Sequence, residues 1–77
     1  MIFEKVKQMI SKEFSVDATK LTRDTRLEED LNIDSLDAVE LVMKLEDTFG
    51  VSISDDTAQS FKTVGEITDF VTENVEA

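Results

Sequence analysis

Apolar residues recur at helical intervals near the start of the chain. Four of them are spaced three or four positions apart, namely Phe3, Val6, Ile10 and Phe14. Because an α-helix completes a turn in about 3.6 residues, this spacing places all four side chains on one face. The pattern predicts an amphipathic helix over residues 2–14.

The next helix is predicted from the residues at its two ends. Asp34 can accept a hydrogen bond from the free backbone N–H groups of a helix start, and Asp37 falls in the first turn, where an acidic side chain is favourable. Gly50 suits the position just past a helix end, because glycine adopts left-handed backbone angles without strain. These signals predict a helix over residues 35–49.

Two further helices are expected in the last part of the chain. Thr63 and Glu66 have the spacing of a capping box, and an apolar stripe follows them. The pattern predicts a last helix over residues 64–75, preceded by a short helical turn around residues 56–61.

The segment between the first two predicted helices has no sustained period. Residues 15–34 therefore predict a long loop, with a single turn at the segment DATK, and loops of this length in a compact domain tend to be functional. The predicted fold class is all-α: a small four-helix bundle of three main helices and one short helix, with the long loop between the first and second helices. A length of 77 residues predicts one domain, over residues 1–77.

The charge of the chain narrows the classes of function. Eighteen acidic side chains against eight basic ones give a net charge of −10. Residues 1–23 carry five bases and three acids, and residues 24–77 carry three bases and fifteen acids. Binding to nucleic acid is disfavoured, because neutralising phosphates requires Lys and Arg. The acidic part suits docking onto basic partners, and it also serves solubility.

The chain contains neither Cys nor His. Disulfides and metal sites built on Cys and His often stabilise small domains, and this sequence can form neither. Charged residues interrupt the apolar positions near the N-terminus, which argues against a signal peptide, and no apolar run reaches membrane-spanning length. We expect a soluble, cytoplasmic monomer that does not insert into membranes.

The predicted helix over residues 35–49 has two apolar faces. One is an ordinary core stripe, formed by Ala38, Leu41, Val42, Leu45 and Phe49. The second consists of Leu36, Val39 and Met43, and it is bordered by Glu40, Glu46 and Asp47. An apolar strip rimmed by one sign of charge is typical of a binding surface. The alternative is that this helix is central and that the long loop covers its second face.

Ser35 is expected at the first position of that helix, in a chain without histidine. Nucleophilic catalysis by serine needs a nearby base, and the nearest lysine along the chain, Lys44, is nine residues away. A phosphate ester on Ser35 would lie beside the positive end of the helix dipole. The position suits a serine that another enzyme modifies. The alternative is a polar residue that merely fills the first turn.

A calcium loop is the competing interpretation of the same segment. Asp30, Asn32 and Asp34 match the first, third and fifth positions of an EF-hand loop. The match then fails, because Ser35 occupies the glycine position and Leu41 occupies the position of the bidentate glutamate. We predict no specific metal site, and an acidic interaction module that responds to calcium is kept as an alternative.

The segment DSLDAVELVMKLE, which begins at Asp34, resembles the signature of acyl carrier proteins of bacterial type II fatty acid synthesis. The likeness extends to LEEDLNID, FGVSISDD and TVGEITDFV, and so to most of the chain. It implies that Ser35 carries 4′-phosphopantetheine, which a phosphopantetheinyl transferase transfers from coenzyme A. The thiol of the arm would hold growing fatty acyl chains as thioesters, and the protein itself would not be an enzyme. A carrier of another pathway, such as polyketide, D-alanyl or specialised lipid synthesis, is the near alternative.

The resemblance also implies two sets of contact residues. Fatty acid synthesis enzymes and the transferase would bind through basic patches to Asp34, Leu36, Asp37, Val39, Glu40, Met43, Glu46 and Asp47. The acyl chain would be sheltered by Leu41, Val42, Leu45, Phe49, Ile53, Phe61, Ile67 and Val71.

The chain departs from the family pattern just before the signature. The family commonly has Leu-Gly there, whereas this chain has Leu31, Asn32 and the bulky Ile33. Asparagine tolerates left-handed backbone angles better than other residues with a Cβ, so we expect the turn to be kept.

Overall fold

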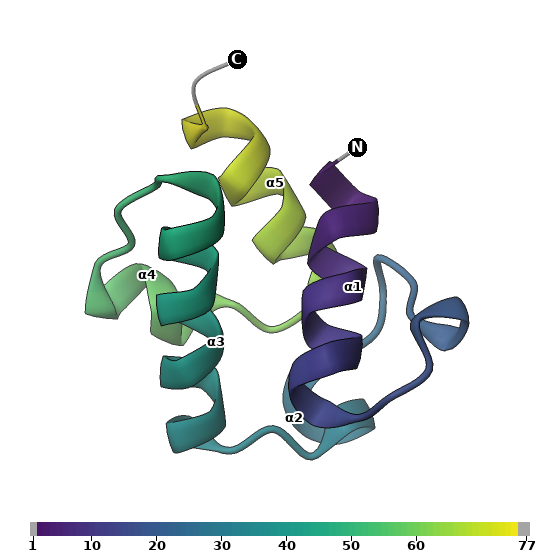
Figure 1. The fold of residues 1–77 in the computed structure, drawn as a ribbon. Helices are drawn as coiled ribbons and strands as arrows, with labels where there is room; N and C mark the ends of the chain where they lie inside the picture. The colour runs from purple at the N-terminus through teal and green to yellow at the C-terminus, as the bar shows by residue number, and fades with distance from the viewer. Residues whose placement is uncertain (1, 76–77) are drawn as a thin grey trace.

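Five α-helices and one short 3₁₀ helix follow one another along the chain, of which the computed structural model describes residues 2–75. In chain order they are α1 (Ile2–Phe14), η1 (Ala18–Lys20), α2 (Leu27–Leu31), α3 (Ser35–Phe49), α4 (Asp55–Ser60) and α5 (Val64–Asn74). Figure 1 shows α1, α3 and α5 as the long helices, with the short α4 beside α3 and α2 near the foot of α1. The predicted all-α fold class is confirmed.

The ends of the long helices follow from their capping residues. The Asp34 carboxylate accepts the Asp37 N–H at 2.9 Å, and the Asp37 carboxylate accepts the Asp34 N–H at 3.3 Å, so both ends of a capping box are closed. At the other end of α3, Gly50 adopts a left-handed conformation with φ 66°. Thr63 and Glu66 form the second predicted capping box, at the start of α5. These features confirm the predicted caps.

The remaining boundaries differ from prediction by single residues. Helix α4 spans Asp55–Ser60 and is capped by the Ser54 hydroxyl, so it starts one residue earlier than expected. Helix α5 ends at Asn74, with Val75 in extended backbone just beyond it. The expected turn at DATK is η1, in which the Thr19 N–H donates to the Asp17 carboxylate at 2.9 Å. The hydrogen bonds from Thr19 lower the pKa of Asp17 below its ordinary value.

The predicted loop contains a helix that the apolar pattern does not reveal. Helix α2 has only five residues, which are too few to show an apolar period. The residue just before it, Arg26, is tied to the helix by a hydrogen bond and an ion pair. The Arg26 N–H donates to the Asp30 carboxylate at 2.8 Å, and the Arg26 guanidinium pairs with Glu29 at 2.7 Å. Helix α2 ends at Asn32, which adopts left-handed angles of φ 55° and ψ 37°. The turn expected from asparagine is therefore kept.

This turn supports a prediction about stability. Replacing Asn32 by alanine is expected to lower the free energy of unfolding by about 1 kcal/mol, because a residue with a Cβ is strained at positive φ. Asn32→Gly is the matched control and should be at least as stable as the wild type, since glycine carries no such strain. Urea unfolding of the three proteins measures the difference. An alanine variant as stable as the glycine variant would contradict the argument.

The core lies where α1, α3 and α5 meet. Helix α1 packs against both α5 and α3. The most deeply buried side chains come from these three helices, and they are Val6, Ile10, Leu41, Leu45, Val64, Ile67 and Val71. No helix within residues 2–75 combines the length and the apolar character needed to cross a membrane.

The segment before α2 is joined to the start of α5 by backbone hydrogen bonds. The Leu27 N–H donates to the Lys62 carbonyl at 2.9 Å, and the Val64 and Gly65 N–H groups donate to the carbonyls of Thr25 and Arg23 at 3.1 and 2.9 Å. The connection places α2 beside the segment between α4 and α5. It thereby brings together the walls of the groove described next.

Candidate functional site

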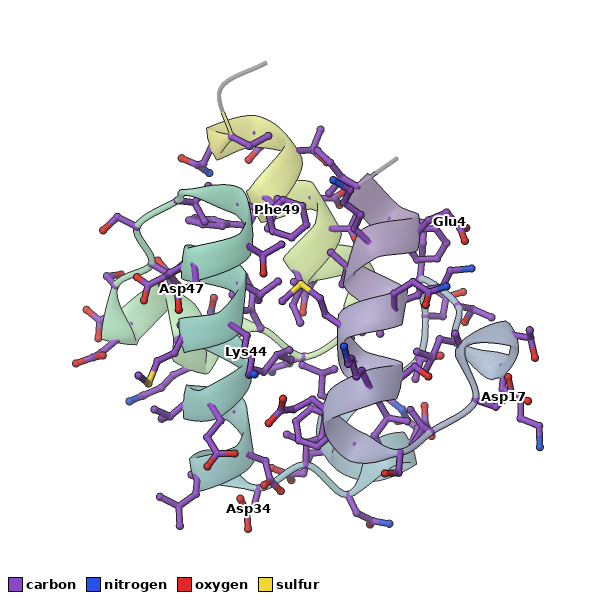
Figure 2. The ribbon with its side chains drawn as sticks, viewed as in Figure 1. Glu4, Asp17, Asp34, Lys44, Asp47 and Phe49 are labelled. Atoms are coloured by element: carbon purple, nitrogen blue, oxygen red, sulfur yellow. The ribbon has the colours of Figure 1, made fainter. Side chains whose placement is uncertain are left out.

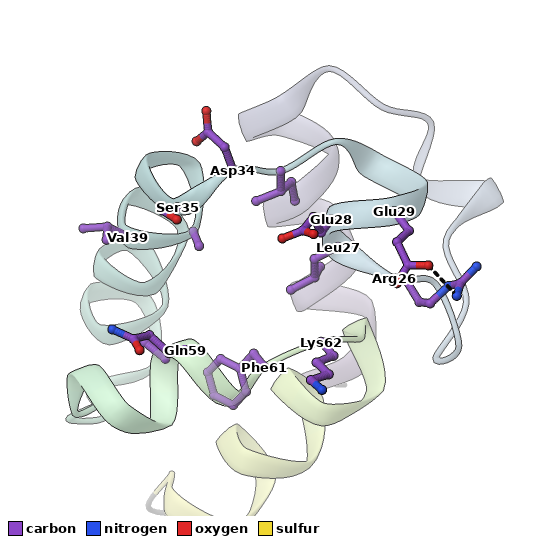
Figure 3. Close-up of a pocket in the computed structure, with 13 residues that line it drawn as sticks. Arg26, Leu27, Glu28, Glu29, Asp34, Ser35, Val39, Gln59, Phe61 and Lys62 are labelled. Atoms are coloured by element: carbon purple, nitrogen blue, oxygen red, sulfur yellow. Dashed lines mark ion pairs between the residues drawn. The ribbon is translucent and has the colours of Figure 1, made fainter.

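Ser35 borders an open groove of about 540 Å³ between α2, α3 and α4. Figure 3 shows Ser35 and Val39 on one wall, Leu27 on another, and Gln59 and Phe61 along a third. The apolar lining consists of Leu27, Ile33, Ala38, Val39, Ala58 and Phe61. The charged lining consists of Arg26, Glu28, Glu29, Asp34 and Lys62. The groove is thus apolar along much of its wall and charged along the rest.

No histidine or lysine of residues 2–75 is placed beside Ser35 as the base of a catalytic serine. Ser35 is exposed at the first position of α3, and the nine-residue separation places Lys44 about 13 Å further along the helix axis. The Lys44 ammonium pairs instead with Glu13 of α1, at 3.7 Å. Lys62 belongs to the segment before α5 and lies across the groove from Ser35 in Figure 3. These surroundings are typical of a serine that another enzyme modifies rather than of a catalytic nucleophile, and the modification of Ser35 stays a prediction.

The helix start favours a phosphate ester on this hydroxyl. The N–H groups of the first residues of α3 have no acceptor within the helix, and the capping box engages only those of Asp34 and Asp37. The positive end of the helix dipole lies at the same place. An exposed oxygen, a helix start and a partly apolar groove together fit a phosphodiester-linked arm such as 4′-phosphopantetheine.

The second apolar face of α3 is exposed to solvent. The exposed fractions of Leu36, Val39 and Met43 are 77%, 54% and 59%, so the predicted alternative, in which the long loop covers this face, is wrong. We call these three residues the α3 stripe. Glu40 and Asp47, which border it, are exposed, and Figure 2 shows Asp34 at the foot of the helix and Asp47 further along it. A role of these residues in partner binding stays a prediction.

Three of the predicted partner-binding acids, Asp34, Asp37 and Glu46, accept hydrogen bonds within the chain. Asp37 closes the capping box with Asp34. Glu46 is half-buried, and its carboxylate accepts the Ile53 N–H at 2.8 Å. The sequence gives no sign of this second contact, because it joins a helix to a loop seven residues later.

The residues predicted to shelter an acyl chain lie mostly in the closed core. Six of them are buried there, namely Leu41, Val42, Leu45, Ile53, Ile67 and Val71. Phe49 is half-buried, and Phe61 is the one member of the set that lines the groove. The apolar groove residues that were not among the predicted site residues are Leu27, Ile33, Ala38 and Ala58. Ile33 was noted in the sequence only as a bulky residue before the signature. Its side chain is 4% exposed and lines the groove together with Ser35.

The EF-hand positions do not converge on one point. The Asp30 carboxylate is engaged by the backbone and side chain of Arg26, and the Asp34 carboxylate caps α3. Within residues 2–75, no three carboxylates gather in the arrangement of a metal site. The carboxylates near Ser35 therefore serve helix ends.

Comparison with known proteins identifies the family. Residues 4–71 match the family model described as a phosphopantetheine attachment site. The chain is 54% identical over 74 residues to an acyl carrier protein of the onion yellows phytoplasma, covering 96% of this chain and 97% of the relative. It is 51% identical over 70 residues to an acyl carrier protein of Lactobacillus johnsonii, covering 91% and 88%.

A solved structure agrees with these relatives. The acyl carrier protein of Enterococcus faecalis superposes with a TM-score of 0.83 at 38% identity, over 95% of this chain and 92% of that protein. Sequence and fold thus agree over nearly the whole length. The chain belongs to the acyl carrier protein family, whose members bear a phosphopantetheine group.

Proposed function

We propose that Ser35 is the attachment site of 4′-phosphopantetheine and that residues 1–77 form a single acyl-carrier domain. The observation that carries this proposal is an exposed serine at the start of α3, beside the groove. When bound, the group supplies the thiol that holds a fatty acyl chain as a thioester. The protein contributes the attachment oxygen, the helix start and the groove wall, and it performs no catalysis itself.

The proposed partners are a phosphopantetheinyl transferase and the enzymes of fatty acid synthesis. The α3 stripe offers an exposed apolar centre, and the exposed carboxylates of Glu40 and Asp47 offer a negative border. This arrangement suits partners that present an apolar contact surrounded by Lys and Arg. A monomer in the cytoplasm, as expected from the sequence, stays a prediction.

The groove is proposed to cover part of the arm and of a short acyl chain. Leu27, Ala58 and Phe61 offer apolar contact within reach of a group that starts at Ser35. The predicted sheltering residues of the core, such as Leu41 and Leu45, are closed off in this structure. Their contact with a longer chain would require the helices to separate.

The experiment that tests the function is the intact mass of the protein after incubation with coenzyme A and a phosphopantetheinyl transferase. We expect a single phosphopantetheinyl increment, followed by a malonyl or acyl increment when fatty acid synthesis enzymes load the thiol. Loading of the thiol only by enzymes of another pathway would replace the fatty acid assignment. No increment, with a folded protein and an active transferase, would contradict the carrier function and favour an acidic interaction module.

A further inference from the structure

Glu46 accepts two hydrogen bonds from the chain that follows α3, one on its main-chain carbonyl and one on its side chain. Its main-chain carbonyl accepts the Gly50 N–H at 2.9 Å. Its side-chain carboxylate accepts the Ile53 N–H at 2.8 Å. One residue thus binds the chain on both sides of the turn that ends α3.

The segment that Glu46 holds is anchored in the core. Val51 and Ile53 are 8% and 7% exposed, although neither belongs to a helix. The Ile53 N–H lies in a part-buried position, and removing its acceptor would leave a poorly hydrated donor without a partner. The hydrogen bond that the Ile53 N–H donates to Glu46 therefore helps to keep Ile53 in place.

Helix α4 packs against α3, and the position of its first turn also depends on the segment that Glu46 holds. It begins at Asp55, directly after Ser54, and none of its side chains is buried. At its other end the Phe61 ring packs edge-on against Phe70, with ring centroids 5.6 Å apart. Helix α4 is thus held at its two ends, by the segment that Glu46 fixes and by Phe61.

Helix α4 also forms one wall of the groove. Ala58 and Gln59 of the helix, and Phe61 just after it, line the groove opposite Ser35 (Figure 3). A shift of the segment before α4 would move this wall. The carboxylate of Glu46 is thereby connected to the shape of the groove through Ile53 and Ser54.

We propose that Glu46 is a positioning residue, whose side-chain oxygen holds the start of α4 and so sets the wall of the groove beside Ser35. Its function in the chain is that of a hydrogen-bond acceptor, whereas the exposed carboxylates of Glu40 and Asp47 act through charge. The inference rests on the proposed function only where it treats the groove as the surroundings of the arm.

Amide hydrogen exchange on the unloaded protein tests the proposal. In Glu46→Ala, the Ile53 amide should exchange about tenfold faster, and the Ala58 amide of α4 should be accelerated with it. The Ile10 amide in the core of α1 should keep its rate, which separates a local effect from general unfolding. In Glu46→Gln, whose amide oxygen can still accept the bond, the rates should stay within about threefold of wild type. Asp47→Ala, the neighbouring exposed carboxylate, is the matched control and should change none of the three.

Several outcomes would overturn the proposal. Unchanged exchange at Ile53 in Glu46→Ala would show that the bond does not hold the segment, and faster exchange at Ile53 without any change at Ala58 would show that α4 does not depend on it. If the Ile53 amide exchanges as fast in Glu46→Gln as in Glu46→Ala, the charge of Glu46 and not its acceptor oxygen holds the segment. If the Ile10 amide also exchanges faster in Glu46→Ala, the alanine variant is unfolding generally and only Glu46→Gln tests the proposal. The Ile53 amide of Glu46→Gln must then exchange as slowly as in the wild type.

The rate of loading by a transferase with coenzyme A gives a second readout. Glu46→Gln keeps the acceptor for the Ile53 N–H and should lose less of the loading rate than Asp47→Asn, in which an exposed charge beside the α3 stripe is removed. An equal loss in both variants would make Glu46 a partner contact and overturn the positioning function. The exchange experiment uses no transferase, so failure of the carrier function would leave its result standing.

Discussion

Replacing Ser35 by alanine is expected to abolish the phosphopantetheinyl increment completely while the protein stays folded. The increment requires the serine oxygen, since it is the atom that would join the phosphodiester. The fold does not require it, because Ser35 is exposed and the capping box is formed by Asp34 and Asp37. The change in the free energy of unfolding should therefore stay within about 0.5 kcal/mol. Intact mass and a thermal melt by circular dichroism measure the two effects.

Ser52→Ala is the matched control for this experiment. Ser52 is also exposed, and it lies in the segment between α3 and α4, away from a helix start. This variant should be loaded as the wild type is. A remaining increment in Ser35→Ala would place the attachment elsewhere, and a loss of loading in Ser52→Ala would show that removal of a surface serine disturbs recognition without removing the site.

Replacing Gly65 by alanine is expected to destabilise the protein, although alanine is the better helix former. Gly65 lies in the first turn of α5, where a Cβ would lie 2.8 Å from the Arg23 carbonyl oxygen and 3.2 Å from its Cβ. The Arg23 carbonyl cannot simply withdraw, because it accepts the Gly65 N–H at 2.9 Å. Overpacking against backbone costs about 1–3 kcal/mol, which corresponds to a fall in Tm of roughly 5–20 °C for a domain of this size.

Gly50→Ala separates crowding from backbone strain. Gly50 has no atom near the position of a Cβ, but its φ of 66° is unfavourable for alanine. This variant should lose about 1 kcal/mol through strain alone. Thermal or urea unfolding compares the two. An increase of about 1 kcal/mol in the free energy of unfolding of Gly65→Ala, as helix propensity alone predicts, would contradict this expectation. It would mean that the segment around Arg23 moves aside at little cost.

The long helices could be predicted from the sequence because their signals are local. The stripe from Phe3 to Phe14 and the caps Asp34 and Gly50 each depend on residues within a few positions of one another. The bounds of α1 and α3 therefore agree with prediction residue for residue. The exposure of the α3 stripe was also foreseeable in part, since a helical wheel separates it from the core face. Whether the loop covered it could be decided only by the fold.

The groove could not be predicted in the same way. Its walls come from α2, α3 and α4, and α2 is too short to show an apolar period. Nothing in the sequence reports that the Leu27 N–H reaches the Lys62 carbonyl, which is the contact that brings two of the walls together. The hydrogen bond from the Ile53 N–H to Glu46 could not be predicted for the same reason. It joins a helix to the segment after it, and the sequence around Glu46 does not indicate that contact.

The junction between the long loop and α5 has a consequence for the synthesis of the protein on the ribosome. The carbonyls of Arg23 and Thr25 accept hydrogen bonds from the N–H groups of Gly65 and Val64, and α1 packs against α5, which is translated after the four other α-helices of residues 2–75. A nascent chain that still lacks this helix has an open core and an unattached loop. The fold can therefore close only once α5 has left the exit tunnel, and an enzyme that requires the folded form of α3 can act only after that point.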